Sequence, residues 1–130
     1  MKEKLEKKLF KDFPCLYGDK DKSPRETLIC FGMETGDGWH DLIRRLSIKL
    51  EPICKKHGCR ASQVKEKFGT LRFYLTFNPE ETDEPIREAE KESAITCEIC
   101  GKAGKLRGSS WMSTECDECW ENTKRKRDEV

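Results

Sequence analysis

The chain has 130 residues, of which 35% are hydrophobic and 39% charged, and its formal net charge is +1. This length is typical of one domain, but so low an apolar fraction predicts a small core that a bound metal ion would help to stabilise. No apolar run is long enough to span a bilayer, which argues against a membrane span. The charged N-terminus lacks the apolar segment of a signal peptide, so we expect a cytoplasmic protein with reduced cysteines.

The first half of the chain predicts two helices separated by a loop. Leucine and phenylalanine recur at helical spacing before Pro14, which predicts a short surface helix. Residues 15–29 predict a loop, and the apolar piece 28–33 predicts a strand. A second helix is expected to start near Trp39 and to end at His57-Gly58, where glycine is a common C-cap.

The sequence GDGW at 36–39 has two interpretations. Glycines around an acid are typical of a nest that binds an anion, so Asp37 and Trp39 are candidates for contact with an anion or a partner. The alternative is a turn that starts the helix and drives Trp39 into the core.

Residues 63–77 predict a β-hairpin with Gly69-Thr70 as its two-residue loop. The side chains of a strand alternate between the two faces of a sheet. One face is therefore expected to carry the apolar residues, Phe68 included, together with one acid, Glu66. The acidic residues 80–95 predict a third helix that follows the hairpin.

The other face of the hairpin combines positive charge with an aromatic ring. Its candidate partner-binding residues are Lys65, Lys67, Arg72 and Tyr74. The expected register places Lys67 opposite Arg72, and like charges opposite each other cost stability unless an anion or an acidic helix lies over them. Charge with a stacking ring is typical of a nucleic-acid or nucleotide surface, whereas the alternative is a solvated outer face.

The C-terminal part contains two C-x-x-C pairs, separated by 15 residues, that predict a zinc site. The four ligands are Cys97, Cys100, Cys116 and Cys119. Zn²⁺ prefers four tetrahedral ligands, and two such pairs supply the set of a four-cysteine finger. A knuckle, a small hairpin and a helix in this order predict a treble-clef unit that holds one structural ion. We expect no chemistry at that ion, because no ligand position is left open.

The remaining cysteines allow several interpretations. Cys15, Cys30, Cys54 and Cys59 are expected to be free thiols, with no bridge among them. A second metal site that includes His57 stays open, although its spacing matches no standard pattern. A nucleophilic Cys–His pair, from Cys54/His57 or Cys30/His40, stays open as well, without a visible third group to orient it.

Three blocks of the sequence resemble a group of small, mostly uncharacterised proteins encoded by bacteriophages and prophages. The blocks are CFGMETGDGWHDLIRRL, QVKEKFGTLRFYL and CEICGKAGKLRGSSWMSTECDEC, and together they span roughly residues 30–119. The resemblance implies a phage origin and a role inside the infected host cell. It implies no catalytic residue and no substrate.

The sequence therefore predicts an α+β protein in which helices pack on a small antiparallel hairpin. We expect an α+β core at 1–94 and a zinc-finger unit with a charged tail at 95–130. The first functional hypothesis is a zinc-stabilised binding module for an anionic partner: nucleic acid, a nucleotide or an acidic protein surface. The second is a stoichiometric inhibitor of a host defence protein, or a sponge for a nucleotide immune signal. The third is a small enzyme using Asp37, His40, Asp41 or Glu66.

Overall fold

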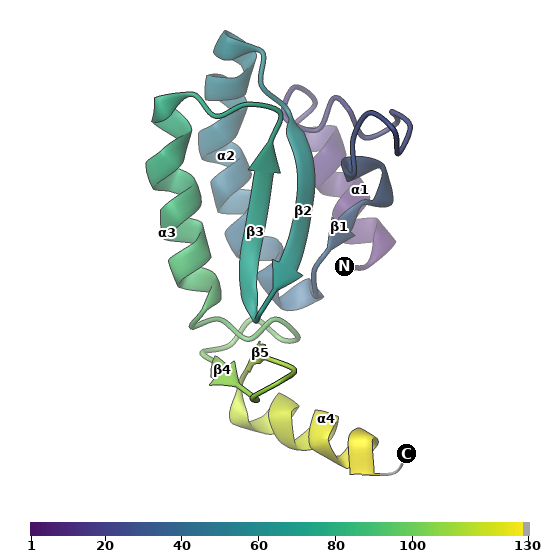
Figure 1. Cartoon of the computed structure of the whole chain (residues 1–130), viewed down its shortest axis with the longest axis vertical. Helices are drawn as coiled ribbons and strands as arrows, with labels where there is room; N and C mark the ends of the chain where they lie inside the picture. Colours follow the sequence, from purple (N-terminus) through teal and green to yellow (C-terminus); the bar gives the residue numbers. More distant parts are fainter. Residues whose placement is uncertain (129–130) are drawn as a thin grey trace.

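The computed structural model describes residues 1–128, the side chains of 124–128 excepted, and confirms the α+β class. Figure 1 shows a three-stranded sheet with α1 (Glu3–Asp12) and α2 (His40–His57) on one face. Among the described residues, no helix lies over the opposite face of the sheet (Figure 1). Within the described residues no helix is long and apolar enough to cross a bilayer.

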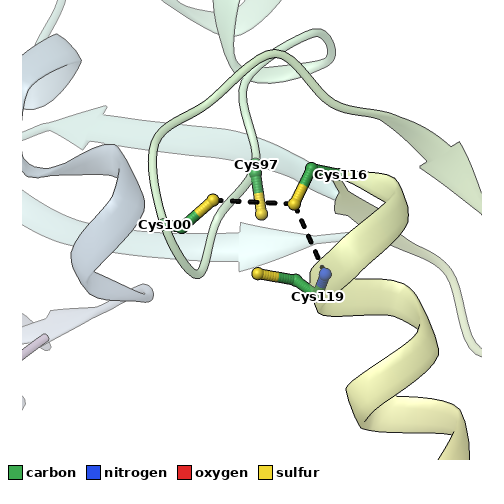
Figure 2. Close-up of side chains that lie close together, drawn as sticks. All are labelled: Cys97, Cys100, Cys116 and Cys119. Atoms are coloured by element: carbon green, nitrogen blue, oxygen red, sulfur yellow. Dashed lines mark hydrogen bonds between the residues drawn. The ribbon is translucent and has the colours of Figure 1, made fainter.

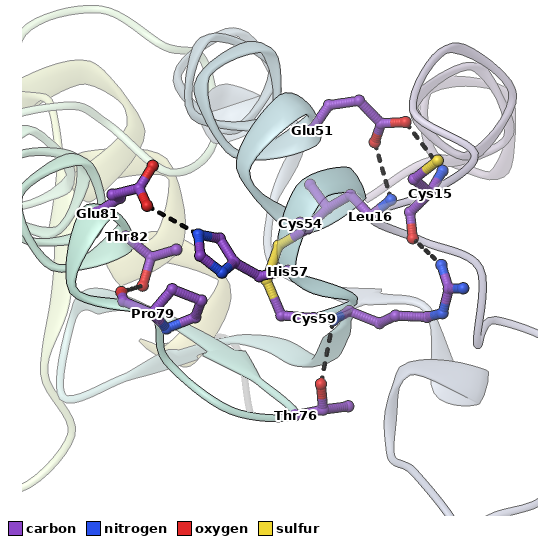
Figure 3. Close-up of a disulfide and its surroundings, with 11 residues drawn as sticks. Cys15, Leu16, Glu51, Cys54, His57, Cys59, Thr76, Pro79, Glu81 and Thr82 are labelled. Carbon is purple, nitrogen blue, oxygen red and sulfur yellow. Dashed lines mark hydrogen bonds and ion pairs between the residues drawn. A yellow bond between two sulfur atoms is a disulfide. The ribbon is translucent and has the colours of Figure 1, made fainter.

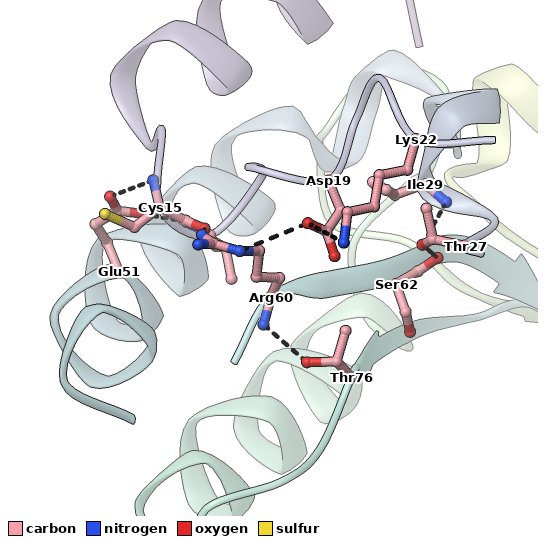
Figure 4. Close-up of polar contacts among 10 residues, drawn as sticks. Cys15, Asp19, Lys22, Thr27, Ile29, Glu51, Arg60, Ser62 and Thr76 are labelled. Atoms are coloured by element: carbon pink, nitrogen blue, oxygen red, sulfur yellow. Dashed lines mark hydrogen bonds and ion pairs between the residues drawn. The ribbon is translucent and has the colours of Figure 1, made fainter. Parts of the chain in front are cut away.

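The predicted first helix is α1, and the loop that follows it is held by polar contacts. The Glu51 carboxylate on α2 accepts the backbone N–H groups of Cys15 and Leu16 at 2.9 and 2.8 Å. The Arg60 guanidinium donates to the Cys15 carbonyl at 2.6 Å and lies 3.5 Å from the Asp19 carboxylate (Figure 4). These contacts satisfy the backbone of the loop, so Leu16 can be buried in the core.

The strand predicted over 28–33 is wrong for most of its length. Ile29–Phe31 form a short 3₁₀ helix, and β1 is confined to Met33–Glu34. Gly32 separates the two with a φ of +78°, a left-handed conformation that interrupts an extended chain. β1 pairs in parallel with β2 (Ala61–Lys67), which makes β2 the central strand.

The second helix is confirmed. A 3₁₀ turn at Asp37–Trp39 leads into α2, and Gly58 ends α2 in the left-handed conformation, with a φ of +82°. Its buried face includes Leu42, Ile43, Leu46 and Leu50. These side chains pack with Trp39 and the inner face of the sheet in one hydrophobic core.

The hairpin is confirmed, but its predicted register is wrong by two residues. β2 and β3 (Thr70–Leu75) are joined by Phe68-Gly69, and both residues have positive φ, at +54° and +84°. The turn is fixed by the Glu66 carboxylate, which accepts the Gly69 N–H at 2.7 Å. A shift of two residues keeps every strand side chain on its expected face. It moves Phe68 from the expected core into the turn, where the ring is 64% exposed.

The C-terminal part begins after α3 (Asp83–Ser93), which lies along the β3 edge of the sheet (Figure 1). The predicted third helix is thus confirmed. We call residues 95–128 the finger unit. It contains a hairpin of β4 (Lys105–Arg107) and β5 (Ser113–Glu115), followed by α4 (Asp117–Asp128). The unit lies at the end of the sheet where β2 turns into β3 (Figure 1).

Candidate functional site

The four predicted ligands come together. The sulfur atoms of Cys97, Cys100, Cys116 and Cys119 all lie within 4.8 Å of one another. Figure 2 shows the first pair on the loop after α3 and the second pair at the start of α4. Four thiols at this separation can hold a metal ion, and thiolate is the donor that zinc prefers in closed sites.

The knuckle that carries the first pair is fixed by backbone hydrogen bonds. The N–H of Gly101 donates to the carbonyl of Cys97 at 2.9 Å, and the N–H of Cys97 donates to the carbonyl of Lys102 at 2.7 Å. Gly101 has a φ of +82°, so glycine is the residue that closes this turn without strain. In this turn Cys100 is exposed and Cys97 is buried.

The second pair lies at a helix N-terminus. The backbone N–H of Cys119 is 3.4 Å from the Cys116 sulfur (Figure 2) and lowers the pKa of that thiol to about 7. Burial, and then the neighbouring thiols, raise the pKa of Cys119. A positive charge at the centre of the group would stabilise all four thiolates, which is what a bound cation supplies.

The GDGW turn is a docking site for the knuckle. The N–H of Gly38 donates to the carbonyl of Glu98 at 2.7 Å, and the indole N–H of Trp39 donates to the carbonyl of Thr96 at 2.9 Å. A Cβ added at Gly38 would lie 2.6 Å from the backbone nitrogen of Gly101 and closer still to the carbonyl oxygen of Cys97. The glycine is therefore required by the close approach of the knuckle.

The same contacts decide the roles of the two GDGW candidates. Trp39 is fully buried, so it is a core residue and presents no surface to a partner. Asp37 accepts the backbone N–H of Lys2 at 2.7 Å and lies 3.8 Å from the ammonium of that lysine. Both observations agree with the alternative of a helix-start turn.

A second docking contact joins the finger unit to the hairpin turn. The hydroxyl of Thr114 on β5 is buried and donates to the carbonyl of Gly69 at 2.6 Å. A Cβ at Gly69 would collide with the side chain of Leu106 on β4. The four cysteines thus belong to a unit that contacts the core at two separate turns.

Glu98 is the third contact between the knuckle and the core. Its carboxylate accepts the N–H of Gly36 at 2.8 Å. Burial raises the pKa of Glu98, the Gly36 hydrogen bond lowers it in part, and the nearby carboxylates of Glu66 and Glu115 raise it further. Glu98 is therefore a half-buried acid that links the knuckle to the turn before α2.

The predicted basic face is open, and its cations lie in a different pairing from the expected one. Lys65 is opposite Arg72, and Lys67 is opposite Thr70. The Tyr74 ring is 42% exposed on the same face. Two acids partly neutralise the pair of like charges: Glu34 lies beside Lys65 on β1, and Glu90 of α3 accepts a 2.5 Å hydrogen bond from Arg72.

The structure adds two cations that the sequence interpretation missed. A groove of about 320 Å³ runs between β3 and α3 and is lined by Thr70, Arg87, Glu90, Lys91 and Ala94. Arg87 and Lys91 are exposed and form no ion pair with any residue that the structure describes. Two basic residues four apart on a helix that is otherwise acidic are the signal that would have drawn attention to them.

Three of the four residues of the enzyme hypothesis line one cleft. This cleft of about 400 Å³ beside Cys100 is lined by Asp37, His40 and Asp41. The Nδ1 of His40 is 3.2 Å from the Asp41 carboxylate, but its Nε2 has no hydrogen-bond partner in the described part of the chain. Cys100 is the one thiol that lines the cleft, and it belongs to the four-cysteine cluster. The lining of this cleft therefore contains no separate thiol nucleophile paired with a base.

The prediction that Cys54 and Cys59 are free thiols is wrong. The two are joined by a disulfide, with their Cα atoms 4.5 Å apart (Figure 3). The left-handed Gly58 turns the chain back at the end of α2, and this brings Cys59 under Cys54. The Nε2 atom of His57 is hydrogen-bonded to the Glu81 carboxylate at 2.8 Å.

These contacts leave neither a nucleophilic Cys54/His57 pair nor a second metal-ligand group among the described residues. Cys15 and Cys30 are free thiols, as expected. The side chains of the basic run KRKR at 124–127 lie outside the described part.

No family model matches the chain, and neither a curated protein nor a solved structure matches it.

Proposed function

We propose that the chain is a binding module stabilised by one zinc ion and directed at an anionic partner. The four cysteines supply four thiolates and leave no position open for water or substrate, so the ion has a structural role. Knuckle, hairpin and helix follow one another in the order of a treble-clef finger, and we assign the finger unit to that type. A module of this kind binds through its surface, without chemistry at the metal.

The observation that carries the proposal is a run of basic residues from the open face to the groove beside α3, in which Lys67, Arg87 and Lys91 have no acidic partner among the described residues. Lys67 is opposite Thr70, and Thr70 lines the same groove as Arg87 and Lys91. Lys65 lies two pairs further along β2, on the same face and opposite Arg72. An extended anion such as a nucleic-acid backbone or an acidic segment of a protein can follow this path, with Tyr74 available for stacking.

The resemblance to phage proteins suggests where such a module would act. Inside an infected cell, an acidic host protein or a nucleotide signal of a defence system has the charge that this face accepts. The groove between β3 and α3, of about 320 Å³, is the feature that favours a nucleotide as the smaller alternative.

The test compares two double variants with the same change of charge. Lys65→Glu/Lys67→Glu alters the open face, and Lys4→Glu/Lys8→Glu alters exposed lysines of α1, which lies on the other side of the sheet. The probes are a fluorescent single-stranded oligonucleotide, a nucleoside triphosphate and a polyglutamate peptide. Wild type should bind at least one of them with an affinity that falls as salt rises.

The first double variant should weaken that binding by about tenfold or more, since two charge-assisted contacts are lost. It should keep a thermal midpoint near that of wild type, because both side chains point away from the core. The α1 variant should bind within about twofold of wild type. Binding of none of the three probes, or equal weakening by both variants, would contradict the proposal.

A further inference from the structure

A second groove, of about 260 Å³, lies between the β2–β3 turn and the finger unit. It is lined by Glu66, Phe68, Ser110, Trp111 and Met112. Trp111 is 77% exposed and Phe68 is 64% exposed. Two large rings on one groove, both open to solvent, are what recognition sites use and what a stable fold would otherwise bury.

Both rings are presented by backbone in the left-handed conformation. Phe68 has a φ of +54° and is the one non-glycine residue in the left-handed region within the described residues. This conformation is unfavourable for a residue with a Cβ, and backbone strain of this kind clusters at ligand sites. Gly108, at a φ of +94°, fixes the loop that presents Trp111, because a Cβ there would collide with the Trp111 carbonyl.

One acid, Glu66, lines the groove, and the ammonium of Lys67 lies over the ring of Phe68 beside it. One oxygen of Glu66 accepts the Gly69 N–H, which orients the carboxylate, and the other has no hydrogen bond within the described part of the chain. The unbonded oxygen of Glu66 is therefore available to a positively charged donor group.

Aromatic faces, a thioether and a free carboxylate oxygen together match one ligand chemistry. A guanidinium group stacks flat on aromatic rings and donates to a carboxylate. The ring of Phe68 already attracts a cation in the free chain, since the Lys67 ammonium lies 5.7 Å from its centroid. The planar guanidinium suits two ring walls better than the compact ammonium of lysine does.

We propose that this groove binds an arginine side chain of a partner protein. Glu66 pairs with the guanidinium, and Phe68 and Trp111 stack against it. None of the residues that line the groove is assigned above to the anionic partner, and the test below leaves Lys65 and Lys67 unchanged, so the two proposals are tested separately. Together they describe a protein partner that presents acidic and basic groups to neighbouring surfaces.

The test uses the three tryptophan indole signals in a ¹H–¹⁵N correlation spectrum, with the Trp111 signal assigned from Trp111→Phe. The zinc-loaded protein is titrated with N-acetyl-arginine amide and, separately, with the neutral isostere N-acetyl-citrulline amide. The arginine compound should shift the Trp111 signal in a saturable way, and the citrulline compound should not. Glu66→Gln keeps an oxygen that can accept the Gly69 N–H, so it should fold and weaken the arginine response by about fivefold or more.

Glu26→Gln, at an exposed carboxylate of the first loop, is the matched control and should leave the response unchanged. The proposal is overturned if arginine does not move the Trp111 signal or if citrulline moves it equally. It is also overturned if an oligothymidine moves that signal and arginine does not, because bases then stack on the rings. Equal weakening by Glu66→Gln and Glu26→Gln would overturn the role of Glu66.

Discussion

Replacing Gly38 with alanine should separate the knuckle from the core. The new Cβ would lie 2.6 Å from the Gly101 nitrogen, whereas ordinary contact begins at 3.4 Å, so the knuckle must withdraw by about 1 Å. The withdrawal breaks the hydrogen bond from Gly38 to Glu98 and strains the one from Trp39 to Thr96. Two such bonds at about 1 kcal/mol each, with residual overlap of about 1 kcal/mol, predict a loss of about 3 kcal/mol.

Urea unfolding of the zinc-loaded protein measures this loss. Gly58→Ala is the control, because a Cβ there meets no atom within 4 Å, although the φ of +82° disfavours alanine. The control should lose about 1 kcal/mol from backbone conformation alone. The φ of Gly38 is not in the left-handed region, so a large effect there must come from the contact with the knuckle. If Gly38→Ala loses no more stability than Gly58→Ala, the docking argument is refuted.

Two further predictions concern the second docking contact and the thiols. Thr114→Val keeps the shape of the buried side chain but removes the hydroxyl that donates to the Gly69 carbonyl. The free energy of unfolding should therefore fall by about 1–2 kcal/mol. An unchanged urea midpoint would count against this contact. Without reductant, iodoacetamide should modify Cys15 and Cys30 in the metal-loaded protein, and modification of the disulfide cysteines would contradict the bridge. After metal removal, Cys116 should react with iodoacetamide before Cys97, Cys100 and Cys119 at neutral pH, because a pKa of about 7 leaves much of its thiol as thiolate. If another of these cysteines reacts first, the low pKa of Cys116 is contradicted.

The sequence patterns predicted the helices and the faces of the sheet better than its connections. The apolar stripe from Trp39 onward and the glycine at position 58 suffice to place α2. The register of the hairpin was missed because glycine was expected at the first turn position. The turn instead takes Phe68 into the left-handed region, which propensity argues against. The faces were still assigned correctly, because side chains alternate with a period of two and the register was wrong by two residues.

The cluster of four cysteines was predictable because the spacing of the two C-x-x-C pairs indicates it directly. The docking of the knuckle on GDGW was not, since Gly38 and Gly101 are far apart in the chain and neither carries a side chain whose pattern could reveal the contact. Two of the three resembling blocks contain glycines that the finger unit packs against, Gly38 and Gly69. Close packing against another segment is a requirement that a single sequence does not display.

The central claim is that four cysteines hold one zinc ion that stabilises the finger unit against the core. Native mass spectrometry of the purified chain tests it most directly, because it reads metal identity, stoichiometry and compactness in one measurement. The account predicts one zinc ion per compact chain, and it predicts that Cys97→Ser loses both the ion and the compact charge-state distribution. A compact chain at the metal-free mass would contradict the claim.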